Sequence, residues 1–138
     1  MSLSETIETL RPFIGVDQLA CLRTLCRGEE GEYFRTKIGE LAALVSSMPK
    51  TYEQEGLGDR AIIHLHYFVG GCNWYITEKD KGDNDGPGQR QAFGLADLGY
   101  GGELGYISIS ELLLAGVELD LYWKPITLAQ LAQKKEDK

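Results

Sequence analysis

The chain has 138 residues, of which 43% are hydrophobic and 25% charged, a composition typical of one folded domain and not of a disordered chain. Its formal net charge of -7 opposes direct binding to nucleic acid, because contacts with a phosphate backbone depend on lysine and arginine. Three cysteines without a CxxC pair argue against a disulfide framework, and no apolar stretch reaches the roughly 18 residues that cross a membrane, so we expect a cytoplasmic protein without membrane contact.

Two short helices are expected at the start of the chain. Ser2 and Glu5 have the spacing of a capping box, so a helix begins there and is disturbed at Pro12. Asp17 can cap a second helix, because the apolar residues that follow recur at helical spacing and Gly28 can end it.

A third helix is expected from Glu29 to Pro49 and completes a helical part over residues 1–49. The following stretch, PKTYEQEGLGD, has the composition of a polar connector. Within the expected helix, apolar residues recur at steps of three and four and so form a stripe, which predicts one buried helix face. The stripe consists of Phe34, Ile38, Leu41, Val45 and Met48.

The charged residues form no basic patch in the sequence. The basic residues of the helical part are separated by acids. The only basic cluster is Lys134 with Lys135, and we expect the segment 132–138 that contains it to be a frayed tail. Acidic blocks near 29–32 and 78–85 are interpreted as solvated surface or, alternatively, as a mimic of nucleic acid. The separated basic residues are Arg11, Arg23, Arg27, Arg35 and Lys37.

Residues 60–123 are expected to form an antiparallel sheet, because the apolar period changes from about 3.6 to 2. Ser108 and Glu111 predict a short helix before the last strand. We therefore expect a single α+β domain over 1–138, with N-terminal helices packed on a mainly antiparallel sheet of about five strands. Strands are expected at 61–69, 72–78, 89–96, 104–109 and 117–123.

The register of the first hairpin follows from its glycine pair. If Gly70 and Gly71 form a two-residue turn, Val69 pairs with Cys72. Period-two alternation then gives two faces. The predicted core side carries Ile63, Leu65, Tyr67, Val69, Cys72, Trp74 and Ile76, and the other side pairs His64, His66 and Phe68 with Thr77, Tyr75 and Asn73 respectively.

This register turns Cys72 away from both histidines, so no metal site is predicted. A three-residue turn or a bulge would shift the register by one and reopen that question. The face with the histidines is too aromatic for an ordinary wet surface. Two interpretations stay open: a helix or loop covers it, or it is a recognition surface.

Two motifs resemble ligand-binding loops but lack essential residues. KGDNDG has Lys81 and Ala92 where a calcium loop of the EF-hand type needs carboxylates, so a turn-rich loop over 79–88 is the simpler interpretation. GYGGELG has Leu104 where a dinucleotide fingerprint needs its third glycine. No cofactor and no catalytic residue is predicted.

Three blocks, NWYITEKD, AFGLADLGYGGELGYISISEL and LDLYWKPITLAQL, carry a family resemblance. Together they resemble the domain-of-unknown-function family 2958 over about residues 73–131. The resemblance implies a bacterial, cytoplasmic accessory protein of plasmids and other mobile DNA. It supplies no active site, although Glu78, Glu103 and Tyr106 lie in its blocks.

Two hypotheses about function follow. The first is a non-enzymatic module that binds a protein partner through the hairpin face and the neighbouring acids. The alternative is an enzyme or regulator acting on a nucleotide or small molecule, with a histidine and Glu78 or Glu103 as acid-base groups. Self-association through the helices stays open. The predicted binding residues are His64, His66, Phe68, Asn73, Tyr75, Glu78 and Glu103.

Overall fold

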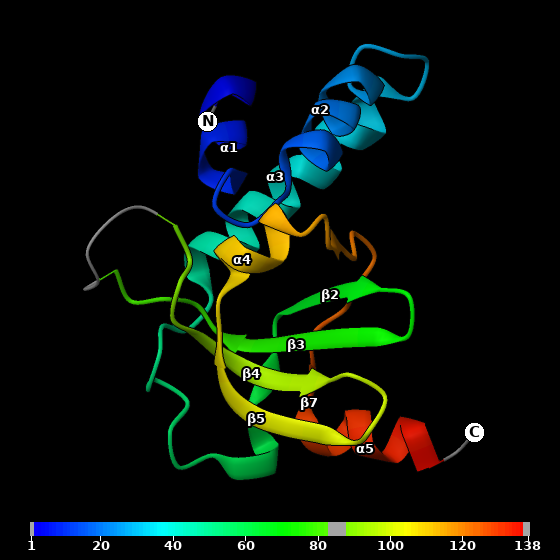
Figure 1. Cartoon of the computed structure of the whole chain (residues 1–138). Coiled ribbons are helices and arrows are strands. Elements are labelled where there is room, and N and C mark those ends of the chain that lie inside the picture. Colours follow the sequence, from blue (N-terminus) through cyan, green and yellow to red (C-terminus); the bar gives the residue numbers. More distant parts are fainter. Residues whose placement is uncertain (1, 83–87, 137–138) are drawn as a thin grey trace.

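The computed structural model describes residues 2–82 and 88–136. Figure 1 shows α1, α2 and α3 together at one end of the molecule, α5 at the other, and the sheet between them. The helices are α1 (Leu3–Leu10), α2 (Val16–Leu25), α3 (Gly31–Ser47), the 3-10 helix η1 (Gly58–Arg60), α4 (Ile109–Leu114) and α5 (Leu128–Glu136). The strands are β1 (Ile62–Ile63), β2 (Leu65–Val69), β3 (Cys72–Glu78), β4 (Ala92–Asp97), β5 (Gly102–Ile107), β6 (Glu118–Leu119) and β7 (Ile126–Thr127).

The helix boundaries follow local capping chemistry. The Ser2 hydroxyl accepts the N–H of Glu5 at 3.1 Å, which confirms the predicted start of α1. The prediction that Asp17 caps α2 is wrong, because α2 begins at Val16 and the capping position is Gly15. Among the described residues, no helix has the length and apolar character needed to span a membrane.

The fold is α+β, as the sequence predicts. Its main sheet is antiparallel, with the strand order β5-β4-β3-β2-β6, and β1 pairs separately with β7. The Gly70–Gly71 turn and the register of β2 with β3 from Leu65 to Val69 are confirmed pair by pair. The residues of the glycine turn therefore determine the register of this hairpin.

The N-terminal helices and α4 cover one face of the main sheet. The helix stripe predicted from the sequence is buried there, with Ile38 fully inaccessible and Phe34 half-buried. Each of the five strands of the main sheet contributes apolar side chains to this core. These are Leu65, Tyr67, Ile76, Ala92, Ile107 and Leu119.

The opposite face carries a second, smaller apolar cluster. Tyr75 packs there with Ile63 and with Leu131 of α5. The prediction that Ile63 shares the core side with Leu65 is wrong, because the regular strand is interrupted at His64, which belongs to neither β1 nor β2. Residues 132–136 of the segment expected to be a frayed tail lie in α5, and 137–138 lie outside the described residues.

Candidate functional site

A β-bulge in β3 turns Glu78 onto the sheet face that the N-terminal helices do not cover. The register shifts between Ile76 and Glu78, so Glu78 pairs with Phe93 and Thr77 is the extra residue. Regular pairing would place Glu78 opposite Ala92, which is buried in the helix-covered core. Bulges bend a strand and redirect its side chains, and this one brings the carboxylate to the side of Phe93.

The connector after α3 is hydrogen-bonded along the end of β3. Thr51 donates its N–H to the Lys79 carbonyl at 2.8 Å. The Gln54 side-chain amide donates to the carbonyls of Ile62 and Thr77 at 3.0 and 2.7 Å. Both Thr51 and Gln54 are buried, and an isolated β-bridge pairs Lys50 with Lys79, so backbone and side-chain bonds together fix the connector against the sheet.

Tyr52 brings this connector onto the carboxylate. Its N–H donates to Oε1 of Glu78 at 2.6 Å, and the Thr77 hydroxyl donates to Oε2 at 3.1 Å. Tyr52 has a φ of 79°, the only positive φ of a non-glycine residue in the described ranges. That conformation costs about 1–2 kcal/mol, so the surrounding contacts must hold it in place.

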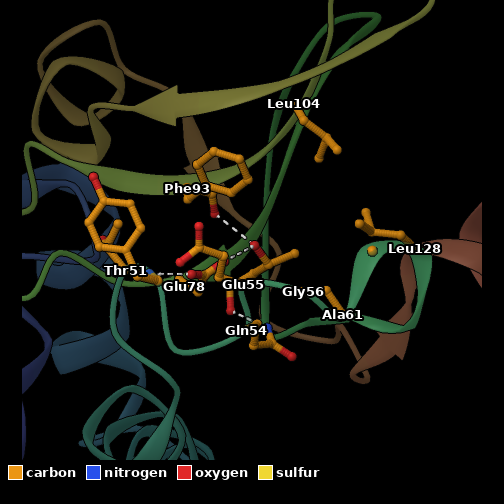
Figure 2. A pocket seen from close by; sticks show the side chains of 12 residues that line it. Thr51, Gln54, Glu55, Gly56, Ala61, Glu78, Phe93, Leu104 and Leu128 are labelled. Atoms are coloured by element: carbon orange, nitrogen blue, oxygen red, sulfur yellow. Dashed lines mark hydrogen bonds between the residues drawn. The ribbon is translucent and has the colours of Figure 1, made fainter.

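Glu78 lines a cavity of about 260 Å³ on this face. The residue is only 5% exposed, and no basic side chain of the described chain forms an ion pair with it. Figure 2 shows Glu78 and Phe93 toward one end of the cavity and Leu104 and Leu128 toward the other. Glu55 is a second carboxylate at its lining. The cavity therefore combines apolar walls with negative charge.

A second cavity of about 420 Å³ continues the first. The two share Gly58, Leu104 and Leu128, and the second extends to Leu131 and Lys135 of α5. Together they form a groove along the exposed side of β5. One end of this groove is acidic and its middle is apolar.

Two tyrosines meet beside the acidic end. The hydroxyls of Tyr52 and Tyr106 are hydrogen-bonded, and their rings meet edge to face with centroids 6.5 Å apart. The hydrogen bond to Tyr52 is the largest cause of a raised pKa of Tyr106, and burial and the charges of Glu55 and Glu78 act in the same direction. The Tyr106 hydroxyl is therefore neutral near pH 7.

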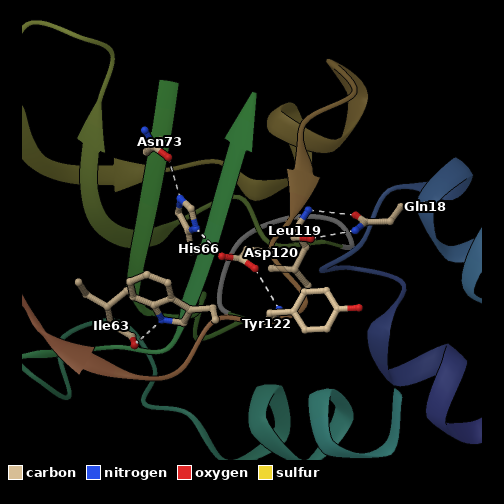
Figure 3. Close-up of polar contacts among 8 residues, drawn as sticks. Gln18, Ile63, His66, Asn73, Leu119, Asp120 and Tyr122 are labelled. Atoms are coloured by element: carbon tan, nitrogen blue, oxygen red, sulfur yellow. Dashed lines mark hydrogen bonds and ion pairs between the residues drawn. The ribbon is translucent and has the colours of Figure 1, made fainter. Parts of the chain in front are cut away.

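His66 lies outside the groove and is engaged on both ring nitrogens (Figure 3). Nδ1 lies 2.9 Å from Oδ2 of Asp120, and Nε2 lies 2.8 Å from Oδ1 of Asn73. The ring stacks on Tyr75, with centroids 4.8 Å apart, and packs against Trp123 at 5.1 Å. His66 thus holds the segment after β6 against β2, and each of its ring nitrogens has a hydrogen-bond partner.

His64 differs from His66 because its ring has no polar contact. Both ring nitrogens are buried without a hydrogen-bond partner among the described residues. Burial lowers the pKa of the His64 ring. No group of three potential metal ligands occurs among the described residues.

The hairpin face that the sequence left open between two interpretations is largely covered. The Trp123 indole N–H donates to the Ile63 carbonyl at 3.1 Å, and its ring packs on Tyr75. Phe68 and Asn73 are half-buried. The segment after β6 supplies this cover, so the available cavity lies farther along the face, beside β4 and β5.

Glu78 is the predicted binding residue that lines the cavity, whereas Glu103 is exposed on the other side of β5 from Leu104. The sequence did not indicate Tyr52 or Gln54. Both lie in the stretch interpreted as a polar connector, and a single sequence carries no signal for a positive φ at a tyrosine.

The acidic loop after β3 is anchored by Asp80. Its buried carboxylate accepts the N–H groups of Gly82, Arg90 and Gln91 at 2.7, 3.0 and 3.0 Å. This carboxylate therefore fixes both ends of the loop. Residues 83–87, which include most of the KGDNDG motif, lie outside the described residues.

Fold and site together define a small α+β domain with an acidic, apolar-walled groove on its sheet. The chain belongs to the family described as protein of unknown function (DUF2958), which matches residues 37–127 and confirms the resemblance seen in the three sequence blocks. The match includes Tyr52, Glu78 and Phe93 but not α1 or α2. No curated protein and no solved structure matches the chain.

Proposed function

We propose that this protein is a non-enzymatic binding module whose groove receives a lysine or arginine side chain of a protein partner. The observation that carries the proposal is the buried Glu78 carboxylate, which faces an apolar cavity without a basic partner in the described chain. A buried carboxylate is stabilised by a cation within hydrogen-bond reach. Lysine and arginine also carry apolar stems that suit walls such as Phe93 and Leu104.

The proposed setting is the bacterial cytoplasm, as an accessory protein of mobile DNA. The family resemblance supports the link to plasmids and integrative elements. Cys21, Cys26 and Cys72 are all free thiols, which supports a reducing compartment. The net charge of -7 favours encounter with a basic partner.

The alternative, an acid-base enzyme or regulator of a nucleotide or small molecule, has less support. It needs His64 or His66 to meet Glu78 or Glu103 in one pocket. Among these residues only Glu78 lines the cavity, and both nitrogens of His66 are already engaged. We therefore favour binding over catalysis for this groove.

The test is an array of short extended peptides that samples every residue type at each position, probed with the purified protein. We expect enrichment of arginine and lysine at one position. Glu78→Gln should weaken those peptides about tenfold, because it removes the charge and keeps the size. Glu103→Gln removes the same charge from an exposed site outside the cavity and should bind like the parent. Equal binding by Glu78→Gln and the parent would contradict the proposal.

A further inference from the structure

Four arginines meet at one cavity among the N-terminal helices. The cavity has a volume of about 290 Å³ and lies between α1, the end of α2 and the start of α3. Arg11, Arg23, Arg27 and Arg35 line it, and Glu8 is the one carboxylate in the lining. In the sequence these four arginines lie apart, among acidic residues, so it is the fold that brings them together.

The arginines are held differently. Arg11 donates from Nε to Oε1 of Glu8 at 2.6 Å, which neutralises that carboxylate. Arg35 donates from Nη1 to the Cys26 carbonyl at 2.5 Å. The side chains of Arg23 and Arg27 make no hydrogen bond or ion pair within the described ranges.

Gly31 permits the position of Arg35. A Cβ at Gly31 would lie 2.3 Å from the Cys26 carbonyl oxygen and 3.0 Å from Nη1 of Arg35. Without that Cβ, the guanidinium reaches the carbonyl at the end of α2. One arginine of the cluster is therefore preorganised by backbone contacts, and its other N–H groups stay available.

We infer that this cavity binds a compact polyphosphate, such as a diphosphate group. Several like charges at one site repel one another, and a multivalent anion relieves that repulsion. Guanidinium groups present paired N–H donors that match phosphate oxygens. All four arginines lie outside residues 37–127, so the site is separate from the family-matched part of the chain and from the Glu78 groove.

The charge around the cavity favours a compact anion over a nucleic-acid strand. The chain as a whole carries a formal charge of -7, so the surface beyond these arginines is strongly acidic. A long strand would extend from the cavity onto that surface and be repelled. A diphosphate has no strand that would extend beyond the arginines.

The test is isothermal titration calorimetry of the whole protein with sodium pyrophosphate at low ionic strength. We expect saturable binding that weakens about tenfold or more in Arg23→Gln/Arg27→Gln. Both residues are exposed and their side chains make no hydrogen bond or ion pair within the described ranges, so the variant should fold, and a thermal melt verifies this. Arg60→Gln/Lys124→Gln removes two positive charges from exposed sites elsewhere and should bind pyrophosphate as the parent does.

Two further titrations, with ADP and with a thymidine oligonucleotide, identify the source of the phosphate. ADP that binds more tightly than pyrophosphate indicates a nucleotide, whereas equal affinity indicates that the diphosphate alone is recognised. A thymidine oligonucleotide that binds more tightly than pyrophosphate would overturn the inference in favour of a nucleic-acid strand. Absence of pyrophosphate binding, or equal binding by Arg23→Gln/Arg27→Gln and the parent, would also overturn it.

Discussion

Gly94 shows how a single residue allows the close strand contact beside the bulge. A Cβ added to Gly94 would lie 2.0 Å from the carbonyl oxygen of Tyr75 and 3.0 Å from Cα of Ile76. These are backbone atoms, which cannot rotate away as a flexible side chain can. Glycine is required here by close approach of two strands and not by a positive φ.

Gly94→Ala should therefore lower the free energy of unfolding by about 2–3 kcal/mol, because β3 and β4 must separate to admit the methyl group. Urea unfolding followed by tryptophan fluorescence measures the change. Gly105→Ala is the matched control, since a Cβ on this β5 residue meets nothing within 4 Å. An equal loss of stability in both variants would contradict the role of the Gly94 contact.

His64 makes stability depend on pH in a definite direction. Burial lowers its pKa in the folded protein, while the unfolded chain keeps the ordinary value of 6.5. As the pH falls through that range, the unfolded state gains a proton that the folded state resists. The stability contribution of neutral His64 is complete above the unfolded pKa and is lost as the pH falls.

His64→Phe should reduce this loss of stability on acidification. The free energy of unfolding near pH 7.5 should be equal to that of the parent or higher by up to about 1 kcal/mol, because two unpaired ring nitrogens are removed. Urea midpoints measured from about pH 7.5 to 5 give the comparison, and groups common to both proteins cancel in the difference. Parallel pH profiles would show that His64 does not carry the effect.

At the scale of elements, the C-terminal helix α5 covers the second face of the sheet. Leu131 is 7% exposed and packs with Ile63 and Tyr75. Lys135 donates to Oδ2 of Asp97 at 2.6 Å and ties the same helix to the end of β4. This helix therefore forms both a wall of the groove and the cover of the small core.

Leu131→Ala should lower the free energy of unfolding by about 2–3 kcal/mol and increase the fluorescence of the apolar dye ANS, because it opens the small core. Leu114→Ala makes the same change in α4, where the side chain is 91% exposed, and should stay within about 0.5 kcal/mol of the parent. Chemical denaturation and dye binding measure both effects. Similar values for the two variants would mean that α5 contributes little to the fold.

The elements that the sequence predicted well are those with local determinants. The capping pair Ser2 and Glu5 and the turn at Gly70–Gly71 were readable because their chemistry lies within a few residues. Strand β7 has only two residues and depends on tertiary packing for stability. Helix α5 was missed although Thr127 and Gln130 form a capping box at its start. The carboxylate that the bulge redirects is bound by the connector after α3, which is distant in sequence.

At the scale of the whole molecule, one hairpin serves both apolar clusters. Leu65 and Ile76 pack in the larger cluster, and Tyr75 of the same hairpin packs in the smaller one. The tryptophans are divided in the same way, with Trp74 against the larger cluster and Trp123 against the smaller. Each tryptophan can therefore report on one side of the sheet.

We predict that both sides unfold in one transition, because the shared hairpin cannot leave one cluster without disrupting the other. Trp74→Phe leaves a reporter in the smaller cluster, and Trp123→Phe leaves one in the larger. In each variant, the urea midpoint from fluorescence should coincide with that from far-ultraviolet circular dichroism. A fluorescence midpoint that separates from the circular dichroism midpoint in either variant would contradict a single cooperative domain.

The candidate sites were less readable from sequence than the fold, because they are made by residues from distant elements. Tyr52 and Glu78 are neighbours only through the connector, and Arg11 and Arg35 share a cavity only because α1 packs beside α3. Hydrophobic periodicity and secondary-structure propensity describe each helix or strand by itself. Convergence of side chains requires knowledge of how the elements pack.

The extra residue in β3 also determines how the groove responds to a change in chain length. Loss of the codon for Thr77 would place the acid directly after Ile76, where regular alternation still sets it opposite Phe93 and on the groove side. A one-codon deletion would thus keep the negative charge in the groove but remove the Thr77 hydroxyl that donates to the acid and the Thr77 carbonyl that accepts from Gln54. Relatives that lack the extra residue should therefore carry an acid directly after the residue equivalent to Ile76, and sequence alignments can test this.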